Sequence, residues 1–367
     1  MKLLLLAGEE SGVLYARRIA EEVRGRVPSA EIRGYGDYGF ETSDLAVIGL
    51  FAVLRRILFF LGVKRTMERA IDEWKPDAVC TVDYPGMNLK LAAYAKARGI
   101  RTVHVVCPQV WAWKEGRIPR IEASLDRLCC FFPFEPKLFK PGFAEFVGHP
   151  LVDAFAAEVK AKGEGERREG RILALLPGSR MGEIEKHLPT LLELVETLQG
   201  DMPDLKVVIP AANDRAYRAI VSCVSRRRSS SRIVVTRGGA RAALRDATAA
   251  VVASGTATLE AALAGCPTVL VYRVNWLFAA IMRRLIRGVR HLGLANIIAE
   301  KAGAPCPMPE LLQEDFTAGE ILQYVSPWLT DGAANAAARR ALADTMKLLR
   351  SDGSAIARIA DCVLSGV

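Results

Sequence analysis

Short apolar segments alternate along this chain with segments of helical hydrophobic periodicity, and the alternation occurs twice. The apolar segments of the first half lie at 2–7, 77–82, 102–106 and 127–131, and those of the second half lie at 172–176, 206–209, 232–236, 249–253 and 268–272. Strands that alternate with helices build a parallel sheet with helices on its faces. The sequence therefore predicts an α/β protein with two Rossmann-like domains.

A charged, glycine-rich segment separates the two halves. Residues 160–170 contain almost no large apolar side chains, which is typical of an inter-domain linker. We therefore expect domains at 1–165 and 166–330, followed by C-terminal helices at 331–367 that could pack back on the first domain. The carboxyl ends of the strands in both domains are expected to face a shared cleft, because sheets of this type bind ligands there.

Composition narrows the class of partner. The net charge is +9, which favours anionic partners such as nucleotides, phosphorylated substrates and acidic lipid headgroups. The eight cysteines form no C-x-x-C pair, and the four histidines show no ligand spacing. We interpret the cysteines as reduced, buried thiols of a cytosolic protein and expect no metal site. The apolar start of the chain ends at Glu9 and Glu10, so it predicts a buried strand and not a secretory signal.

Two motifs in the second half suit a bound diphosphate. The first, Gly178-Ser179-Arg180, directly follows a predicted strand, so its backbone N–H groups and the guanidinium of Arg180 could face an anion. The second follows another strand and begins a helix whose amino end attracts anions, with an acidic side chain one turn further on for ribose hydroxyls. Its residues are Ser254, Gly255, Thr256 and Glu260. The alternative for the first motif is an ordinary strand–turn with a surface arginine, and the alternative for the second is a capped helix with a solvated glutamate.

Carboxylates follow two predicted strands of the first half. Glu9 and Glu10 lie in a G-E-E-S-G sequence, and Asp83 lies in D-Y-P-G. The first sequence is not G-x-G-x-x-G, which argues against a dinucleotide cofactor. A carboxylate at the carboxyl end of a strand can serve as a general base or bind a sugar hydroxyl. A helix start rich in Glu and an Asx turn are the structural alternatives.

An ordered set of motifs spans nearly the whole chain. They are G-E-E-S-G at 8–12, D-Y-P at 83–85, P-Q-V-W-A-W at 108–113, F-P-F-E at 132–135, G-H-P-L-V-D at 148–153, L-P-G-S-R at 176–180, S-G-T-A-T-L-E at 254–260 and P-E-L-L-Q at 309–313. The set resembles lipid-A-disaccharide synthases, a family of inverting glycosyltransferases of the type B fold. Val13 stands where that family has Asp, Ala295 stands where it has Pro, and 299–308 is longer than the family pattern suggests.

The resemblance implies a reaction and its partners. It implies transfer of 2,3-diacylglucosamine from its UDP derivative to 2,3-diacylglucosamine 1-phosphate, with a β-1,6 linkage and release of UDP. The first domain would bind the acceptor and the cytoplasmic face of a Gram-negative inner membrane, and the second would bind the UDP-sugar. No cofactor and no nucleic acid are expected, and a homo-oligomer stays open. The sequence does not fix the acyl chain length.

The resemblance also implies roles for individual residues. The catalytic candidates are Asp83 and Glu9, and Asp83 is favoured as base because Pro85 restricts its loop. The nucleotide would bind at Gly178, Ser179, Arg180, Ser254, Gly255, Thr256 and Glu260. Substrate contacts are expected at Glu10, Ser11, Asn88, Trp111, His149 and Asn296.

Two apolar segments that carry arginines predict membrane contact. Residues 50–63, which include Leu58, Phe59, Phe60 and Leu61, are too short to span a bilayer but suit a helix in the headgroup region. Residues 277–290 repeat the pattern. Core packing between helices is the alternative for both segments.

Two other functions remain open at this stage. One is a different UDP-GlcNAc enzyme of the same architecture, such as a 2-epimerase or the peptidoglycan transferase, which the W-A-W motif and the apolar segment disfavour. The other is a non-catalytic basic protein that binds membrane or nucleic acid. Only the Arg226–Arg228 cluster supports it, and such a run usually forms a solvated face.

Overall fold

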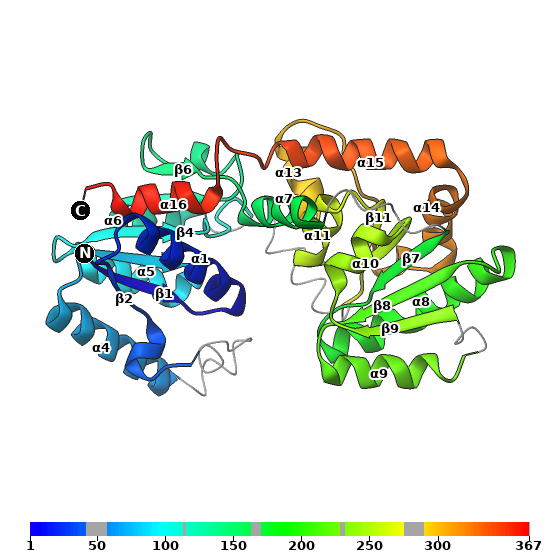
Figure 1. Cartoon of the computed structure of the whole chain (residues 1–367), viewed down its shortest axis with the longest axis horizontal. Coiled ribbons are helices and arrows are strands. Elements are labelled where there is room, and N and C mark those ends of the chain that lie inside the picture. The colour runs from blue at the N-terminus through cyan, green and yellow to red at the C-terminus, as the bar shows by residue number, and fades with distance from the viewer. Residues whose placement is uncertain (42–56, 113–114, 163–169, 228–231, 275–289, 367) are drawn as a thin grey trace. The chain divides into compact units, whose positions relative to one another are not determined.

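The structure is a computed structural model that describes residues 1–41, 57–112, 115–162, 170–227, 232–274 and 290–366 (Figure 1). These residues form two compact units, 1–153 with 349–367, and 154–348. The boundary expected at 165/166 lies outside the described residues, as does most of the basic apolar segment at 277–290.

The first unit contains a six-stranded parallel sheet of order β2-β1-β3-β4-β5-β6. Its strands are β1 (Lys2–Ala7), β2 (Glu31–Arg33), β3 (Ala78–Val82), β4 (Arg101–Val105), β5 (Arg127–Cys130) and β6 (Ala144–Phe146). Leu3 and Leu5 of β1 pack toward α1 (Glu10–Arg26) and α16 (Ala355–Leu364). Leu4 and Leu6 pack toward α4 (Ile57–Trp74) and α5 (Pro85–Lys96). Both faces of the sheet are thus covered, which explains its continuous apolar strands.

The remaining segments of this unit connect the strands. They are η1 (Tyr35–Tyr38), η2 (Glu115–Arg117), α6 (Ile118–Ser124), η3 (Pro136–Leu138) and the first residues of α7 (Pro150–Lys162). Helix α16 ends the chain, and Figure 1 shows it beside α1. The C-terminal helices expected at 331–367 are therefore divided, because the helix before α16 belongs to the second unit.

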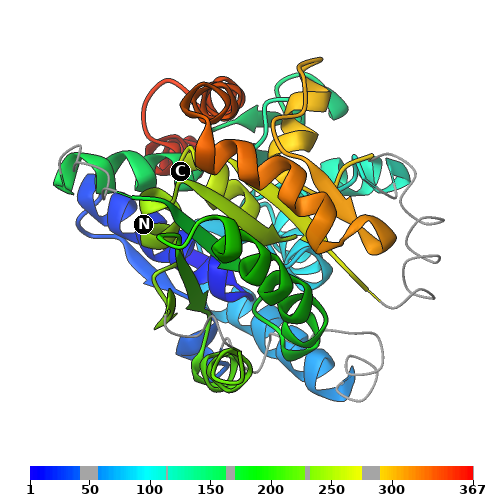
Figure 2. The same ribbon diagram turned by 90° about the vertical axis from the view of Figure 1, so that its right-hand side faces the viewer.

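The second unit repeats the architecture with the strand order β12-β11-β10-β7-β8-β9 (Figures 1 and 2). Its strands are β7 (Ile172–Leu176), β8 (Lys206–Ala211), β9 (Ile233–Arg237), β10 (Ala249–Ala253), β11 (Thr268–Tyr272) and β12 (Glu310–Leu312). Its helical segments are α8 (Met181–Asp201), α9 (Asp214–Val224), α10 (Ala240–Asp246), α11 (Thr256–Leu263), α13 (Leu294–Lys301), η5 (Gln313–Asp315), α14 (Ala318–Thr330) and α15 (Gly332–Lys347). Helices α8, α9 and α14 share one apolar core with the strands.

Each sheet has one topological switch point, where successive strands of the chain lie on opposite sides of the first strand. In the first sheet β2 lies on one side of β1, whereas β3 and the strands after it lie on the other. In the second sheet β8 and β9 lie on one side of β7, whereas β10 to β12 lie on the other. The crevice beside such a switch point is where open α/β sheets bind ligands. The pairs β1–β3 and β7–β10 therefore mark the two places to search for a site.

The predicted α/β class and the predicted strands are confirmed, whereas some details of the sequence interpretation are wrong. Residues 160–162 were expected in the linker but complete helix α7, in keeping with the alanines that precede them. Leu14, an apolar residue of α1, is 60% exposed. Of the cysteines, Cys223 and Cys306 are exposed thiols, and the others are buried.

Candidate functional site

The loop after β7 is shaped by a glycine. Gly178 has a φ of 119°, and a Cβ at this position would lie 2.5 Å from Oε2 of Glu183. Any other residue would therefore meet both an unfavourable backbone conformation and a clash with a carboxylate. The turn holds Ser179 and Arg180 at the carboxyl edge of the sheet, directly before α8.

The carboxylate of Glu183 occupies this loop. Its Oε2 accepts the backbone N–H groups of Ser179 at 3.1 Å and Arg180 at 3.3 Å, and its Oε1 accepts Nη1 of Arg180 at 3.0 Å. The sequence suggested that these N–H groups face an anionic ligand, but the protein's own carboxylate already satisfies them. What the loop can offer a phosphate is the rest of the Arg180 guanidinium, whose side chain is 64% exposed.

A buried histidine links this loop to the end of β11, which lies two strands away from β7 in the sheet. Nδ1 of His187 lies 2.8 Å from the carbonyl oxygen of Pro177, and Nε2 accepts the N–H of Arg273 at 3.0 Å. The two bonds require a neutral imidazole with its proton on Nδ1, and burial lowers the pKa of His187 accordingly. His187 thus fixes the loop after β7 relative to the end of β11.

The start of α11 is the more open anion site. Gly255 precedes the helix with a φ of 142°, and among the described residues no side chain caps the helix start. Ser254 donates its N–H to Val271 at 3.2 Å, so its place is set by the adjacent strand. Thr256 begins the helix and is exposed. Uncapped N–H groups at a helix start favour bound phosphate.

An arginine that sequence reasoning missed holds Glu260. Nε of Arg241 donates to Oε1 of Glu260 at 2.9 Å, and Nη1 of the same arginine pairs with Glu158 at 3.1 Å. The Glu260 side chain is largely buried, and among the described residues no group donates a hydrogen bond to its second carboxylate oxygen. The arrangement fixes the carboxylate while leaving one oxygen able to accept a ligand hydroxyl.

The loop after β3 has an unusual backbone. Asp83 and Tyr84 both have positive φ values, of 50° and 51°. Such conformations cost free energy for residues other than glycine and are concentrated at functional sites. Oδ1 of Asp83 accepts the N–H of Tyr84 at 2.8 Å, and Pro85 then begins α5. The half-buried carboxylate is therefore fixed in direction.

The side chain of Asn88 holds the backbone of that loop through hydrogen bonds. Its Nδ2 lies 2.7 Å from the carbonyl oxygen of Asp83 and 3.2 Å from that of Val82, and its Oδ1 accepts the hydroxyl of Tyr35 at 2.8 Å. The side chain is fully buried. Its amide is thus engaged within the protein and holds the backbone of Asp83, while the predicted contact of Asn88 with substrate stays a prediction.

Glu9 and Asp83 interact across the switch point of the first sheet. Glu9 directly precedes α1, and its pKa is raised by partial burial and by the negative charge of Asp83. The pKa of Asp83 is raised by burial, against the lowering effect of the Tyr84 N–H. A carboxylate with a raised pKa is a stronger base than an ordinary one. Glu10 and Ser11 begin α1, but their side chains lie outside the described residues.

A second acidic residue of this unit is buried among aromatic rings. Oε1 of Glu135 accepts the indole N–H of Trp111 at 3.1 Å, and Oε2 accepts the N–H of Phe132 at 3.1 Å. Burial raises the pKa of Glu135 to about 8. Trp111 also packs edge to face on Phe134. Trp111, a predicted substrate contact, is therefore buried, and its indole N–H is bonded within the protein.

The last two predicted substrate residues are buried as well. His149 packs against Phe131 and Phe132, its Nδ1 accepts the N–H of Leu151 at 3.2 Å, and burial lowers its pKa to about 4. Asn296 bonds to both backbone groups of Met308 and to Glu310, which anchors α13 beside β12. Their roles as substrate contacts stay predictions.

The predicted membrane segment is described from residue 57 onward. Leu58 is 80% exposed and Leu61 is 44% exposed at the start of α4. Phe59 and Phe60 are half-buried and pack on the apolar core beneath, with the ring of Phe59 6.2 Å from that of Phe40. No described helix is both long and apolar enough to cross a bilayer.

One cluster of metal-ligating side chains occurs among the described residues. Cys107, Cys130 and Glu135 bring their ligand atoms within 4.8 Å of one another. All three are buried, and burial raises the pKa of each group, which favours its protonated form. The cluster therefore fits a neutral hydrogen-bonded network.

The fold has close counterparts among solved structures. The S. aureus MnaA–UDP co-structure matches with a TM-score of 0.64 at 12% identity over 98% of this chain and 95% of that chain. The UDP-GlcNAc 2-epimerase from Neisseria meningitidis bound to UDP-GlcNAc matches with a TM-score of 0.60 at 10% identity over 99% and 98%. The two Rossmann-like units and their switch-point loops define an enzyme of the type B glycosyltransferase fold.

The sequence comparisons identify the family within that class. The profile described as lipid-A-disaccharide synthetase matches residues 3–359. Lipid-A-disaccharide synthase of Burkholderia mallei (strain NCTC 10229) is 37% identical over 362 residues, which cover 94% of this chain and 90% of the relative. The Xanthomonas campestris pv. campestris (strain 8004) enzyme is 36% identical over 348 residues, covering 89% and 78%. The chain belongs to the lipid-A-disaccharide synthase family and is a glycosyltransferase that forms the lipid A disaccharide.

Proposed function

We propose that this enzyme transfers 2,3-diacylglucosamine from its UDP derivative to 2,3-diacylglucosamine 1-phosphate. The products are the β-1,6-linked disaccharide 1-phosphate and UDP. The observation that carries the proposal is the placement of the motifs at both switch points: carboxylates follow β1 and β3, and anion-binding groups follow β7 and β10. The family membership and the UDP ligands of the fold's solved counterparts support the donor.

In the proposed mechanism, Asp83 accepts the proton of the acceptor hydroxyl. The hydroxyl oxygen then forms a bond to the anomeric carbon while the bond from that carbon to the UDP oxygen breaks. The electron pair leaves with the diphosphate, and the configuration at the anomeric carbon inverts. Burial and the nearby negative charge of Asp83 raise the pKa of Glu9. We assign Glu9 to orienting the acceptor.

The second unit would stabilise the leaving group. The uncapped start of α11 and the guanidinium of Arg180 are the groups proposed for the diphosphate, because both place positive charge where negative charge develops. Glu260 is proposed for the ribose hydroxyls, since Arg241 fixes its direction.

We further propose that the enzyme works at the cytoplasmic face of the inner membrane. The exposed Leu58 and Leu61 at the start of α4 support this, because both acylated substrates reside in a membrane and a protein surface of this kind can enter the headgroup region.

The reaction itself is tested with purified enzyme and both substrates in mixed micelles. Mass spectrometry should detect the disaccharide 1-phosphate only when donor and acceptor are both present, and NMR should show the β linkage. Release of UDP without disaccharide, or conversion of UDP-GlcNAc to its 2-epimer, would contradict the proposal. The second outcome would favour the alternative UDP-GlcNAc enzyme.

A further inference from the structure

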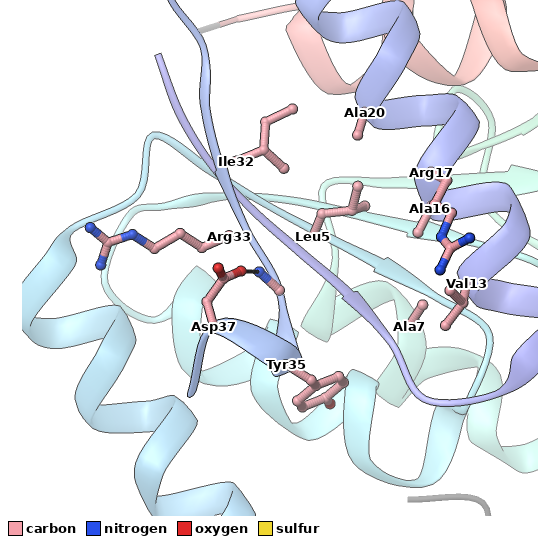
Figure 3. Close-up of a pocket in the computed structure, with 11 residues that line it drawn as sticks. Leu5, Ala7, Val13, Ala16, Arg17, Ala20, Ile32, Arg33, Tyr35 and Asp37 are labelled. Atoms are coloured by element: carbon pink, nitrogen blue, oxygen red, sulfur yellow. Dashed lines mark hydrogen bonds between the residues drawn. The ribbon is translucent and has the colours of Figure 1, made fainter. Parts of the chain in front are cut away.

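A pocket of about 240 Å³ opens beside the first sheet, between α1 and the segment that runs from β2 into η1 (Figure 3). Most of its wall is apolar and is formed by Leu5, Ala7, Val13, Ala16, Ala20 and Ile32. An apolar cavity of about 150 Å³ can bind benzene, so this volume is enough for part of an alkyl chain.

The sequence explains why the wall is apolar. Leu5 and Ala7 lie on one face of β1 because side chains alternate along a strand. Val13, Ala16 and Ala20 lie on one face of α1 because they are three and four residues apart. The alanines are too small to fill the space that α1 leaves above the edge of the sheet.

One cation at the pocket has no partner among the described side chains. The ring of Trp74 lies 4.5 Å from the guanidinium carbon of Arg33, and Asp37 accepts the N–H of Gly34 at 2.6 Å. Arg17 is exposed, and none of the described side chains pairs with it. Figure 3 shows it on α1, close to Val13 and Ala7. An apolar wall with one unpaired cation suits an amphiphile that has an alkyl chain and an anionic head.

Two residues that line the pocket, Ala7 and Val13, flank the candidate catalytic residue Glu9 in the sequence. Ala7 ends β1 two residues before Glu9, and the N–H of Val13 donates to the carbonyl oxygen of Glu9 at 2.9 Å. Val13 occupies the position at which the sequence departs from the G-E-x-S-G-D pattern. Valine here keeps this part of the wall apolar, where an aspartate would place a charge.

We propose that this pocket binds one acyl chain of the acceptor substrate and that Arg17 lies beside the acceptor phosphate. The proposal rests on the proposed function, because it takes the acceptor to be an acylated sugar phosphate. Such binding would hold the acceptor hydroxyl near Glu9 and Asp83.

Binding of simple alkyl phosphates tests the pocket without relying on catalysis. Calorimetry on the full chain, below the micelle concentration, should show affinity rising by about fourfold for each methylene that becomes buried. Ala16→Leu fills the pocket and should abolish that dependence on chain length. Leu14→Ser, on the same helix but 60% exposed, is the matched control and should retain it. If affinity depends on chain length in the same way in the two variants, at unchanged melting temperatures, the proposal that the pocket binds the alkyl chain is wrong.

Two further measurements connect the pocket with the acceptor. Arg17→Ala should weaken alkyl phosphates about tenfold but leave alkyl alcohols of equal length unchanged. Ala16→Leu should raise KM for the acylated acceptor while leaving KM for the UDP donor unchanged. If alkyl phosphates bind in the pocket but do not compete with the acceptor, the acceptor assignment is wrong. If no disaccharide forms with wild-type protein, the proposed function fails, whereas the calorimetric series still decides the pocket.

Discussion

Glu183 holds Arg180 by two routes: its Oε1 accepts Nη1 of Arg180 at 3.0 Å, and its Oε2 accepts the backbone N–H of the same residue at 3.3 Å. One carboxylate thus fixes both the backbone and the guanidinium of the arginine that we propose for the diphosphate. Because the carboxylate uses one edge of the guanidinium, the other N–H donors remain for a ligand.

The first prediction follows from this pair. Arg180→Ala should weaken UDP binding by roughly 2–4 kcal/mol, the range for loss of one partner of a charged contact. Glu183→Gln should have a smaller effect, because it keeps the guanidinium but loosens its support. Titration calorimetry with UDP measures both. Arg237→Ala, which breaks an exposed ion pair with Asp214 elsewhere in the unit, is the control. Unchanged UDP affinity in Arg180→Ala would remove this residue from the site.

The second prediction separates membrane contact from core packing in α4. Leu58→Ser with Leu61→Ser should release the protein from anionic lipid vesicles at unchanged melting temperature, because both side chains are exposed. Phe59→Ser with Phe60→Ser should instead lower the melting temperature, since these rings pack on the core. Vesicle co-sedimentation and thermal unfolding distinguish the two. If the leucine variant unfolds or stays bound, the start of α4 is not the membrane face.

The third prediction concerns the pH dependence contributed by Glu135. Its pKa in the folded protein is about 8, well above the ordinary value of 4.5, so the native state retains a proton that the unfolded state has lost. Stability should therefore fall as the pH rises from about 4.5 to 8. Buried His149 has a lowered pKa of about 4 and acts in the opposite sense, but only below its ordinary value of 6.5.

Between pH 6.5 and 8, the effect of Glu135 on stability is therefore separated from the effect of His149. Across it the melting temperature of Glu135→Gln should fall less than that of the wild type, because glutamine has no proton to lose. Exposed Glu21→Gln should behave like the wild type. Identical slopes for the wild type and Glu135→Gln would show that Glu135 is ionised in the native state.

The fold could be predicted from the sequence to the extent that strands are buried on both faces. Several inner strands have almost entirely apolar sequences, such as A-V-C-T-V in β3 and A-A-V-V-A in β10. The strands that were missed, β2, β6 and β12, lie at sheet edges, have three residues each and are partly exposed. They lack the periodic apolar signal because only tertiary pairing defines them.

The site could be predicted only in part, for a similar reason. Asp83 and Glu9 follow buried strands, so the strand pattern located them. The contacts of Glu183 and Arg241 could not be predicted from the sequence pattern, because they depend on partners that folding brings close. Spacing of three residues between Arg180 and Glu183 in a helix start was the one available signal. Asn88 was identified as functional, but its burial and its bond to Asp83 could not be read from spacing.

The fourth prediction concerns metal ions. The proposed diphosphate site uses the start of α11 and Arg180 to balance charge, so transfer should proceed at an unchanged rate in excess EDTA. The assay requires substrate micelles free of divalent cations. Loss of transfer on addition of EDTA, with recovery on addition of Mg²⁺ or Mn²⁺, would show that the charge balance is incomplete without a metal.

The central claim is that Asp83 is the base that activates the acceptor. The variant Asp83→Asn keeps the shape of the side chain, and its Oδ1 can still accept the N–H of Tyr84. Turnover with saturating substrates should fall by about 10²-fold or more, the usual contribution of a general base, while UDP affinity stays unchanged. Glu9→Gln should reduce turnover less and raise KM for the acceptor. If Asp83→Asn retains most of its turnover while Glu9→Gln abolishes it, Glu9 is the base and the assignment of Asp83 is wrong.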